Sequence, residues 1–173
     1  HTANPLTVND GVGDDVMVLN GGIFTLASNS NGPVFSPATA TANINTGGML
    51  RLSATGLTNA GTGVHADNYI YQHASVLEYT PNLAFASTGV TFFPNVDAVT
   101  IPIFRTTDNL GLIGGGMFTT INGLFEANGT ITFANAGVKT FRNGLIGTGN
   151  IGTNGTSGNF IITGLTASLG GTG

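Results

Sequence analysis

The stretch "NGLFEANGTITFANAGVKTFRNGL" (122–145) decides the fold prediction. In it, large apolar residues alternate with small polar ones in runs of four or five, and Asn-Gly pairs separate the runs. Alternation of this kind indicates β-strands with one buried face, and Asn and Gly tolerate the positive φ of tight turns. The stretch therefore predicts three short strands joined by tight turns.

Each side chain of this stretch can also be assigned to a face. Large apolar residues are expected to enter the core, and charged residues are expected to keep a nearly neutral surface soluble. The predicted inward residues are Leu124, Ile131, Phe133 and Phe141. The predicted outward charges are Glu126, Lys139 and Arg142.

Composition excludes several classes of protein. Only 7% of the 173 residues are charged, whereas 40% are apolar, so the chain lacks the high charge and low hydrophobicity of disordered proteins. Its four basic residues are scattered along the sequence, which argues against nucleic-acid binding and against an anionic membrane partner. Without cysteine it has neither disulfides nor thiolate metal sites. No apolar run approaches the length of a membrane span, so we expect no membrane insertion.

Short β-rich runs recur along the rest of the chain, and some resemble one another. The related segments are "GGIFTL" (21–26), "GGMLRL" (47–52), "GGMFTT" (115–120) and "NGLFEA" (122–127). The interval between the starts of the first two suits one turn of a three-sided solenoid. The much shorter interval between the last two suits adjacent sides of one turn.

Two architectures fit these runs. The favoured one is an all-β parallel β-helix, or β-solenoid, in which short strands of successive turns stack. The alternative is an antiparallel β-sandwich, in which the Asn-Gly pairs form hairpins. The breaks are too frequent for sandwich strands, so we prefer the solenoid. We expect a single domain over residues 1–173, with an irregular region at about 60–110.

The last hundred residues also resemble a known type of repeat. The segments concerned are "ASVLEYTPNLAFASTGVTFFPN" (74–95) and "GLFEANGTITFANAGVKTFRNGLIGTGNIGTNGTSGNFIITG" (123–164). Both are similar to the Gly/Asn/Thr-rich β-solenoid repeats of long secreted surface proteins and adhesins of Bacteroidota-type Gram-negative bacteria. This resemblance implies an extracellular, right-handed β-helix used as a stalk, adhesin or fibre, and it implies no catalytic residue.

An acidic stretch is the first candidate metal site. In "NDGVGDDVMV" (9–18), Asp10, Asp14 and Asp15 partly match a nonapeptide that binds calcium in β-rolls. Such sites are built between consecutive copies, and this chain has one copy. A solvated turn before a strand is therefore the preferred interpretation, and the sequence leaves calcium binding open.

Other polar residues are candidates for metal binding or catalysis. A metal could be held by His65, Asp67 and His73, but their spacing matches no defined motif. Paired carboxylates for glycoside hydrolysis would have to come from Glu78, Asp97, Asp108 and Glu126, which are far apart in sequence. We therefore predict no catalytic residue, no metal and no cofactor, and we do not expect an enzyme.

The prediction for function is a structural protein, an extracellular subunit of a bacterial surface filament. Neither "LTVNDG" (6–11) nor "LTASLGGTG" (165–173) shows a charged cap, which implies either further repeats in a longer chain or stacking on a neighbour. The partner we expect is another copy, bound head to tail. One alternative is an adhesin module that recognises glycans through Tyr69, Tyr71 and Tyr79. Another is a pilin-like sandwich joined by an inserted strand.

Overall fold

The computed structural model describes residues 6–26, 34–36, 39–53, 68–80, 83–86, 101–113, 120–133, 138–153, 159–164 and 167–169. These residues form an all-β structure of parallel sheets and contain no α-helix. Within this part of the chain, no helical segment has the length and hydropathy needed to cross a membrane. The all-β class predicted from the sequence is confirmed.

Nineteen short strands build the described structure. The strands are β1 (Thr7–Asn9), β2 (Val16–Val18), β3 (Ile23–Leu26), β4 (Val34–Ser36), β5 (Ala42–Ile44), β6 (Met49–Leu52), β7 (Tyr69–Tyr71), β8 (Val76–Tyr79), β9 (Leu83–Ala86), β10 (Ile103–Thr106), β11 (Leu110–Ile113), β12 (Thr120–Ile121), β13 (Leu124–Ala127), β14 (Ile131–Phe133), β15 (Val138–Phe141), β16 (Leu145–Gly147), β17 (Ile151–Thr153), β18 (Asn159–Ile162) and β19 (Ala167–Leu169).

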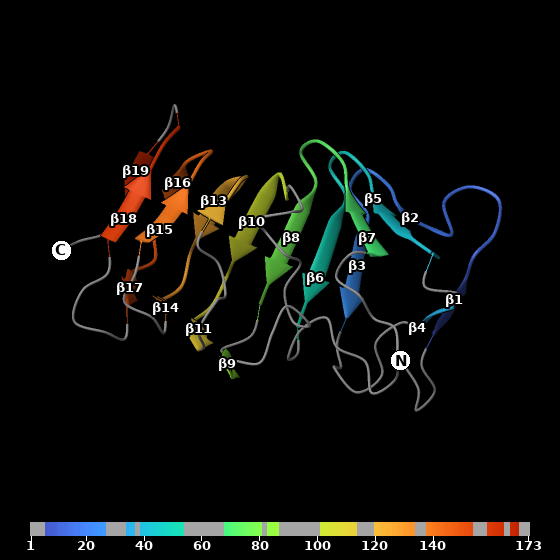
Figure 1. The fold of residues 1–173 in the computed structure, drawn as a ribbon, viewed down its shortest axis with the longest axis horizontal. Helices are drawn as coiled ribbons and strands as arrows, with labels where there is room; N and C mark the ends of the chain where they lie inside the picture. Colours follow the sequence, from blue (N-terminus) through green and yellow to red (C-terminus); the bar gives the residue numbers. More distant parts are fainter. Residues whose placement is uncertain are drawn as a thin grey trace.

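A seven-stranded sheet runs through the molecule in the order β19-β16-β13-β10-β8-β6-β3, and we call it the central sheet. Figure 1 shows these strands side by side along the long axis, from blue β3 to red β19. We call the course of the chain from one strand of the central sheet to the next a pass. The first paired residues of β3, β6, β8 and β10 are Ile23, Met49, Val76 and Ile103, so the number of residues in a pass is nearly constant in this half of the chain. The echo between the segments "GGIFTL" and "GGMLRL" is thus a direct strand pairing.

Each pass contains fewer residues in the second half of the chain. In the central sheet, Ile103 pairs with Leu124, Phe125 pairs with Leu145, and Leu145 pairs with Ala167. Each of these intervals along the chain is shorter than any interval between the earlier partners. The stretch 122–145 therefore spans slightly more than one pass of the chain through the central sheet.

Four smaller parallel sheets accompany the central one, in the orders β1-β4, β9-β11-β14-β17, β2-β5-β7 and β12-β15-β18. Consecutive strands belong to different sheets, and from β10 onward every third strand returns to the central sheet. All the described strand pairs are parallel, which contradicts the antiparallel sandwich considered as the alternative.

The physical reason for that correction lies in the Asn-Gly pairs. Asn20-Gly21 joins β2 to β3 and Asn143-Gly144 joins β15 to β16, so these pairs turn the chain from one sheet into another. Gly21 and Gly144 have φ values of 75° and 99°, which only glycine adopts readily. Gly123 serves a different need, because a Cβ there would lie 1.7 Å from the Ile101 carbonyl oxygen of the preceding pass.

The region expected to be irregular, about 60–110, is described only in part, and its described part includes the strands β7, β8, β9 and β10. β7, β8 and β10 each pair in register with a strand of an earlier pass. The irregularity of the region as a whole stays a prediction. Residues 60–67, 81–82 and 87–100 lie outside the described residues.

The core is a continuous column of apolar side chains between the sheets. Three rings from two sheets stack in it: Phe104 on Phe125 with centroids 5.1 Å apart, and Phe125 on Phe141 with centroids 5.5 Å apart. The predicted inward positions of Ile131, Phe133 and Phe141 are confirmed by their burial.

Two of the assignments to faces are wrong. Leu124 is partly exposed, and its neighbour Phe125 is fully buried in its place. Lys139, predicted to be an outward charge, is only 7% exposed, and its Nζ lies 5.7 Å from the ring centroid of Phe133. A lysine can occupy such a place because its long apolar stem packs with core residues and its ammonium is attracted to an aromatic face. Arg142, by contrast, is exposed as predicted.

Candidate functional site

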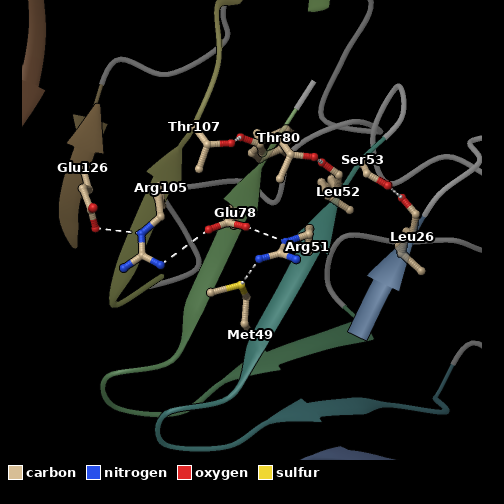
Figure 2. A network of polar contacts seen from close by, with 11 residues as sticks. Leu26, Met49, Arg51, Leu52, Ser53, Glu78, Thr80, Arg105, Thr107 and Glu126 are labelled. Atoms are coloured by element: carbon tan, nitrogen blue, oxygen red, sulfur yellow. Dashed lines mark hydrogen bonds and ion pairs between the residues drawn. The ribbon is translucent and has the colours of Figure 1, made fainter. Parts of the chain in front are cut away.

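Four charged residues form a ladder across the outer face of the central sheet. Arg51, Glu78, Arg105 and Glu126 occupy the same register position on the adjacent strands β6, β8, β10 and β13. Figure 2 shows the side chains linked in this order. We call this set the charge ladder.

Ion pairs connect each member of the charge ladder to the next. The Nε of Arg51 donates to Glu78 Oε1 at 2.6 Å, the Nη1 of Arg105 lies 3.5 Å from Glu78 Oε2, and the Nε of Arg105 donates to Glu126 Oε2 at 2.8 Å. At the far end, Asn128 Nδ2 donates to Glu126 Oε1 at 3.1 Å. Positive and negative charges thus alternate along the stack of strands.

Glu78 is the most buried member of the charge ladder, with 3% of its surface exposed. A carboxylate removed from water in this way is stable only when counter-charges and hydrogen bonds compensate for its lost hydration, and the two arginines supply both. Partial burial alone lowers the pKa of Arg105, but the hydrogen bond and charge of Glu126, and then those of Glu78, raise it above its usual value. Arg105 therefore stays charged at any physiological pH.

A second ladder, built from hydroxyl groups, runs along the ends of the same strands. The side chains of Ser53, Thr80 and Thr107 approach backbone carbonyl oxygens of the preceding pass at 3.3–3.4 Å, and their backbone N–H groups donate to those oxygens at 3.0 Å. The acceptors are the carbonyl oxygens of Leu26, Leu52 and Tyr79 (Figure 2). The hydroxyl ladder thus joins the passes from β3 to β10, and the charge ladder joins those from β6 to β13.

The arrangement of the charge ladder is chemically suited to fixing the order of the strands. Charges directly opposite on neighbouring strands attract when their signs differ and repel when they match. If β10 paired with β6 in place of β8, Arg105 would lie beside Arg51. The alternating order of the charges therefore penalises that mispairing. The two carboxylates of the charge ladder, Glu78 and Glu126, belong to the set weighed for glycoside hydrolysis, and both are engaged with Arg105.

Asp108, a third member of that set, does not belong to the charge ladder. Asp108 is exposed and accepts a hydrogen bond from the backbone N–H of Asn109 at 2.7 Å. Asp97 lies outside the described residues. The ladder is thus an ion-paired column of two carboxylates and two guanidinium groups.

The carboxylates of the acidic stretch hold the next pass of the chain. Asp15 accepts hydrogen bonds from the backbone N–H groups of Gly11 at 2.6 Å and Thr41 at 2.8 Å, and both bonds lower the pKa of its carboxyl, the Thr41 bond more strongly. Asp14 accepts from Asn43 Nδ2 at 3.3 Å, and Asp10 accepts from the hydroxyl of Thr39 at 2.5 Å. The stretch therefore works as a turn that is bonded to its neighbour, in keeping with the preferred interpretation.

Of the possible metal cluster of His65, Asp67 and His73, the structure describes only His73. His73 is exposed in the turn between β7 and β8, and the other two lie outside the described residues. Among the residues that the structure describes, no group of three or more His, Asp or Glu side chains could hold a metal ion.

The tyrosines proposed as a glycan-binding surface belong to the core. Tyr69 and Tyr79 are buried, and Tyr71 packs against the core with its hydroxyl buried. Burial raises the pKa of all three, and each of Tyr71 and Tyr79 is raised further by a neighbouring tyrosine. This corrects the prediction, because strand alternation points Tyr69 and Tyr71 to the same inner side of β7.

A single substitution tests whether the charge ladder stabilises the fold. We expect Glu78→Gln to lower the free energy of unfolding by about 2–3 kcal/mol, since it removes a buried negative charge and leaves two arginines less compensated. The matched variant Glu126→Gln, at the more exposed end, should cost about 1 kcal/mol or less. Urea denaturation measures both, and equal losses would contradict the role of burial.

Comparison with known proteins returns no match: no family model, no curated protein and no solved structure is significantly similar to the chain.

Proposed function

We propose that the chain is a right-handed parallel β-helix that serves as a structural, extracellular subunit of a bacterial surface filament and assembles end to end. One observation carries the proposal: seven parallel strands from successive passes pair without a break in the central sheet. The cyclic order in which the chain visits its sheets supports a helical path, and parallel crossovers are right-handed in nearly all proteins.

The energetics of the stack suit a rigid rod. Successive passes are joined by backbone hydrogen bonds and by the continuous core, and the two ladders of side chains add further bonds between the passes from β3 to β13. Six spacings separate the outermost strands of the central sheet, which gives a rod segment of about 29 Å. Such a structure adds length with each pass and depends on no catalytic group.

The edges of the sheets support assembly between copies. Among the described strands, β3 and β2 are paired on one side only, and so are β19 and β18 at the other extreme. Apolar side chains are exposed on these edge strands, including Met17, Ile23 and Ile161. Unpaired edges of this kind accept a further strand, and joining unlike edges produces a head-to-tail contact that propagates. The extracellular, bacterial setting rests on the resemblance of the sequence to surface-protein repeats.

Electron microscopy and sedimentation of the purified chain at increasing concentration test this proposal. We expect elongated particles that lengthen with concentration. Ile23→Lys, which places a charge at a 51% exposed position of edge strand β3, should suppress them. The control Val138→Lys changes a 45% exposed residue on β15, a strand paired on both sides, and should leave assembly intact.

The proposal is contradicted if the parent chain stays a compact monomer at every concentration. It is also contradicted if both lysine variants affect assembly equally, because the edge strands would then have no special part.

A further inference from the structure

A groove lies at the corner where the chain turns into the central sheet, and we call it the corner groove. Its volume is about 470 Å³, within the range typical of small-molecule sites. It is lined by Tyr71, His73, Ala74, Pro102, Ile103, Asn122, Gly123, Leu124 and Asn143. Its described lining lies between the end of β7 and the turn after β12.

The corner groove is elongated along the stack. Its lining comes from the turns that precede β8, β10, β13 and β16, which are four neighbouring strands of the central sheet. Three strand spacings correspond to roughly 14 Å. A ligand that uses the whole groove is therefore a linear molecule that lies across successive passes.

The lining combines an apolar floor with uncharged polar groups. Pro102, Ile103 and Leu124 supply apolar surface, and His73 and Asn143 are exposed polar side chains at its rim. Among the described residues, no Lys, Arg, Asp or Glu belongs to the lining. The described lining offers no carboxylate to an ammonium group, and the guanidinium of Arg142 beside it is engaged with Asn122 Oδ1 at 3.0 Å, so an uncharged ligand is favoured.

The amide groups of this lining are suited to hydroxyl groups. Each asparagine side chain offers both a donor and an acceptor, as a hydroxyl does, so the two can bond reciprocally. The guanidinium Nη1 of Arg142 donates to Asn122 Oδ1 at 3.0 Å and thereby fixes the orientation of that amide. A preset orientation reduces the entropy lost when a ligand binds.

Tyr71 adds an independent observation. Its side chain borders the corner groove, and its hydroxyl is buried without a hydrogen-bond partner among the described residues. Because this hydroxyl is buried, a ligand in the groove contacts the ring of Tyr71, which adds apolar surface to the lining.

A peptide ligand fits the corner groove less well, because the backbone around it is already paired. The N–H groups of Ser75, Leu124 and Arg142 donate to the carbonyl oxygens of Gln72, Pro102 and Ile121. Recognition by strand addition requires free backbone groups along an edge. Side chains and apolar surface are what the groove presents.

We propose that the corner groove binds a linear, uncharged oligosaccharide that lies along the stack. Its apolar ring faces pack on Pro102, Ile103 and Leu124, and its hydroxyl groups bond with His73, Asn122 and Asn143. This role is additional to the structural one and does not depend on assembly between copies.

Saturation-transfer NMR on the intact chain tests the proposal with defined probes. The probes are cellotetraose and N-acetylated chitotetraose as uncharged chains, and a sulfated heparin tetrasaccharide as the charged counterpart. We expect transfer to at least one uncharged probe and none to the sulfated one. The variants His73→Ala and Asn143→Ala should each weaken that binding about three- to tenfold, and the double variant should abolish it.

The control is Asn159→Ala, an exposed asparagine on β18 that is not part of the groove. It should bind as the parent does. Absence of transfer to both uncharged probes, equal binding of the sulfated probe, or an equal loss in the control variant overturns the proposal. Since Ile23→Lys acts on assembly and leaves the groove residues intact, failure of filament formation and failure of saccharide binding are measured separately.

Discussion

Replacing Phe125 with alanine should lower the free energy of unfolding by about 3–5 kcal/mol. Phe125 is 0% exposed, and its ring lies between those of Phe104 and Phe141, stacked at interplanar angles of 23° and 4°. The substitution leaves a cavity in the middle of the column and removes ring contacts that connect the central sheet to β15. Urea denaturation measures the loss, provided that the dependence of the free energy on urea concentration stays unchanged.

The matched control is the preceding residue. Leu124 lies on the opposite face of β13 and is partly exposed, so Leu124→Ala should cost about 1 kcal/mol or less. If the two variants lose similar stability, or if Leu124→Ala loses more, the alternation of β13 described above is wrong.

This pair of residues also shows how far the sequence determines the faces of a strand. Period-two alternation requires residues two apart to share a face. Leu124 and Glu126 therefore cannot point to opposite sides, and neither can Lys139 and Phe141. The prediction assigned each residue by its chemical type, which overrode the period in both strands. In each case the structure follows the period, because packing of the larger aromatic ring decides the face.

The sequence predicts the pairing of successive passes better than it predicts the face on which each side chain lies. The echo of "GGIFTL" (21–26) in "GGMLRL" (47–52) gave the correct parallel partners, because small residues at the corner repeat wherever two passes approach closely. Gly48 shows why, since a Cβ there would lie 2.4 Å from the carbonyl oxygen of Val18. Local sterics of this kind are visible in the sequence.

The charge ladder could not be recognised in advance, although its signal is present. Each member is the third residue of a strand: "MLRL", "VLEY", "IFRT" and "LFEA". The last interval along the chain, from Arg105 to Glu126, is shorter than the two before it, because the passes shorten after β10. A search at a fixed period misses a column of this kind, and only strand register brings the four residues together. The corner groove is assembled in the same way from four separate turns.

Raising the pH above about 10 should destabilise the protein steeply. Burial raises the pKa of Tyr69, Tyr71 and Tyr79 above the ordinary value of 10.0, so these groups stay protonated in the folded chain. In the unfolded chain they release their protons near pH 10. Their contribution to stability is complete below that pH and declines above it, because the unfolded state then binds fewer protons than the folded one. Three such groups lower the free energy of unfolding by about 4 kcal/mol for each further pH unit.

Thermal melts followed by circular dichroism between about pH 8 and 12 measure this slope, and phenolate absorbance reports when the tyrosines ionise. The control is Tyr69→Phe, which should reduce the slope by about a third. It should cost little at neutral pH, since the Tyr69 hydroxyl is buried without a partner among the described residues. Ionisation of all three tyrosines near pH 10 while the fold persists would contradict their burial. An unchanged slope in Tyr69→Phe would assign the alkaline transition to other groups. A reduced slope would instead place the tyrosine hydroxyls inside the stack, where they could not form the glycan-binding surface considered from the sequence.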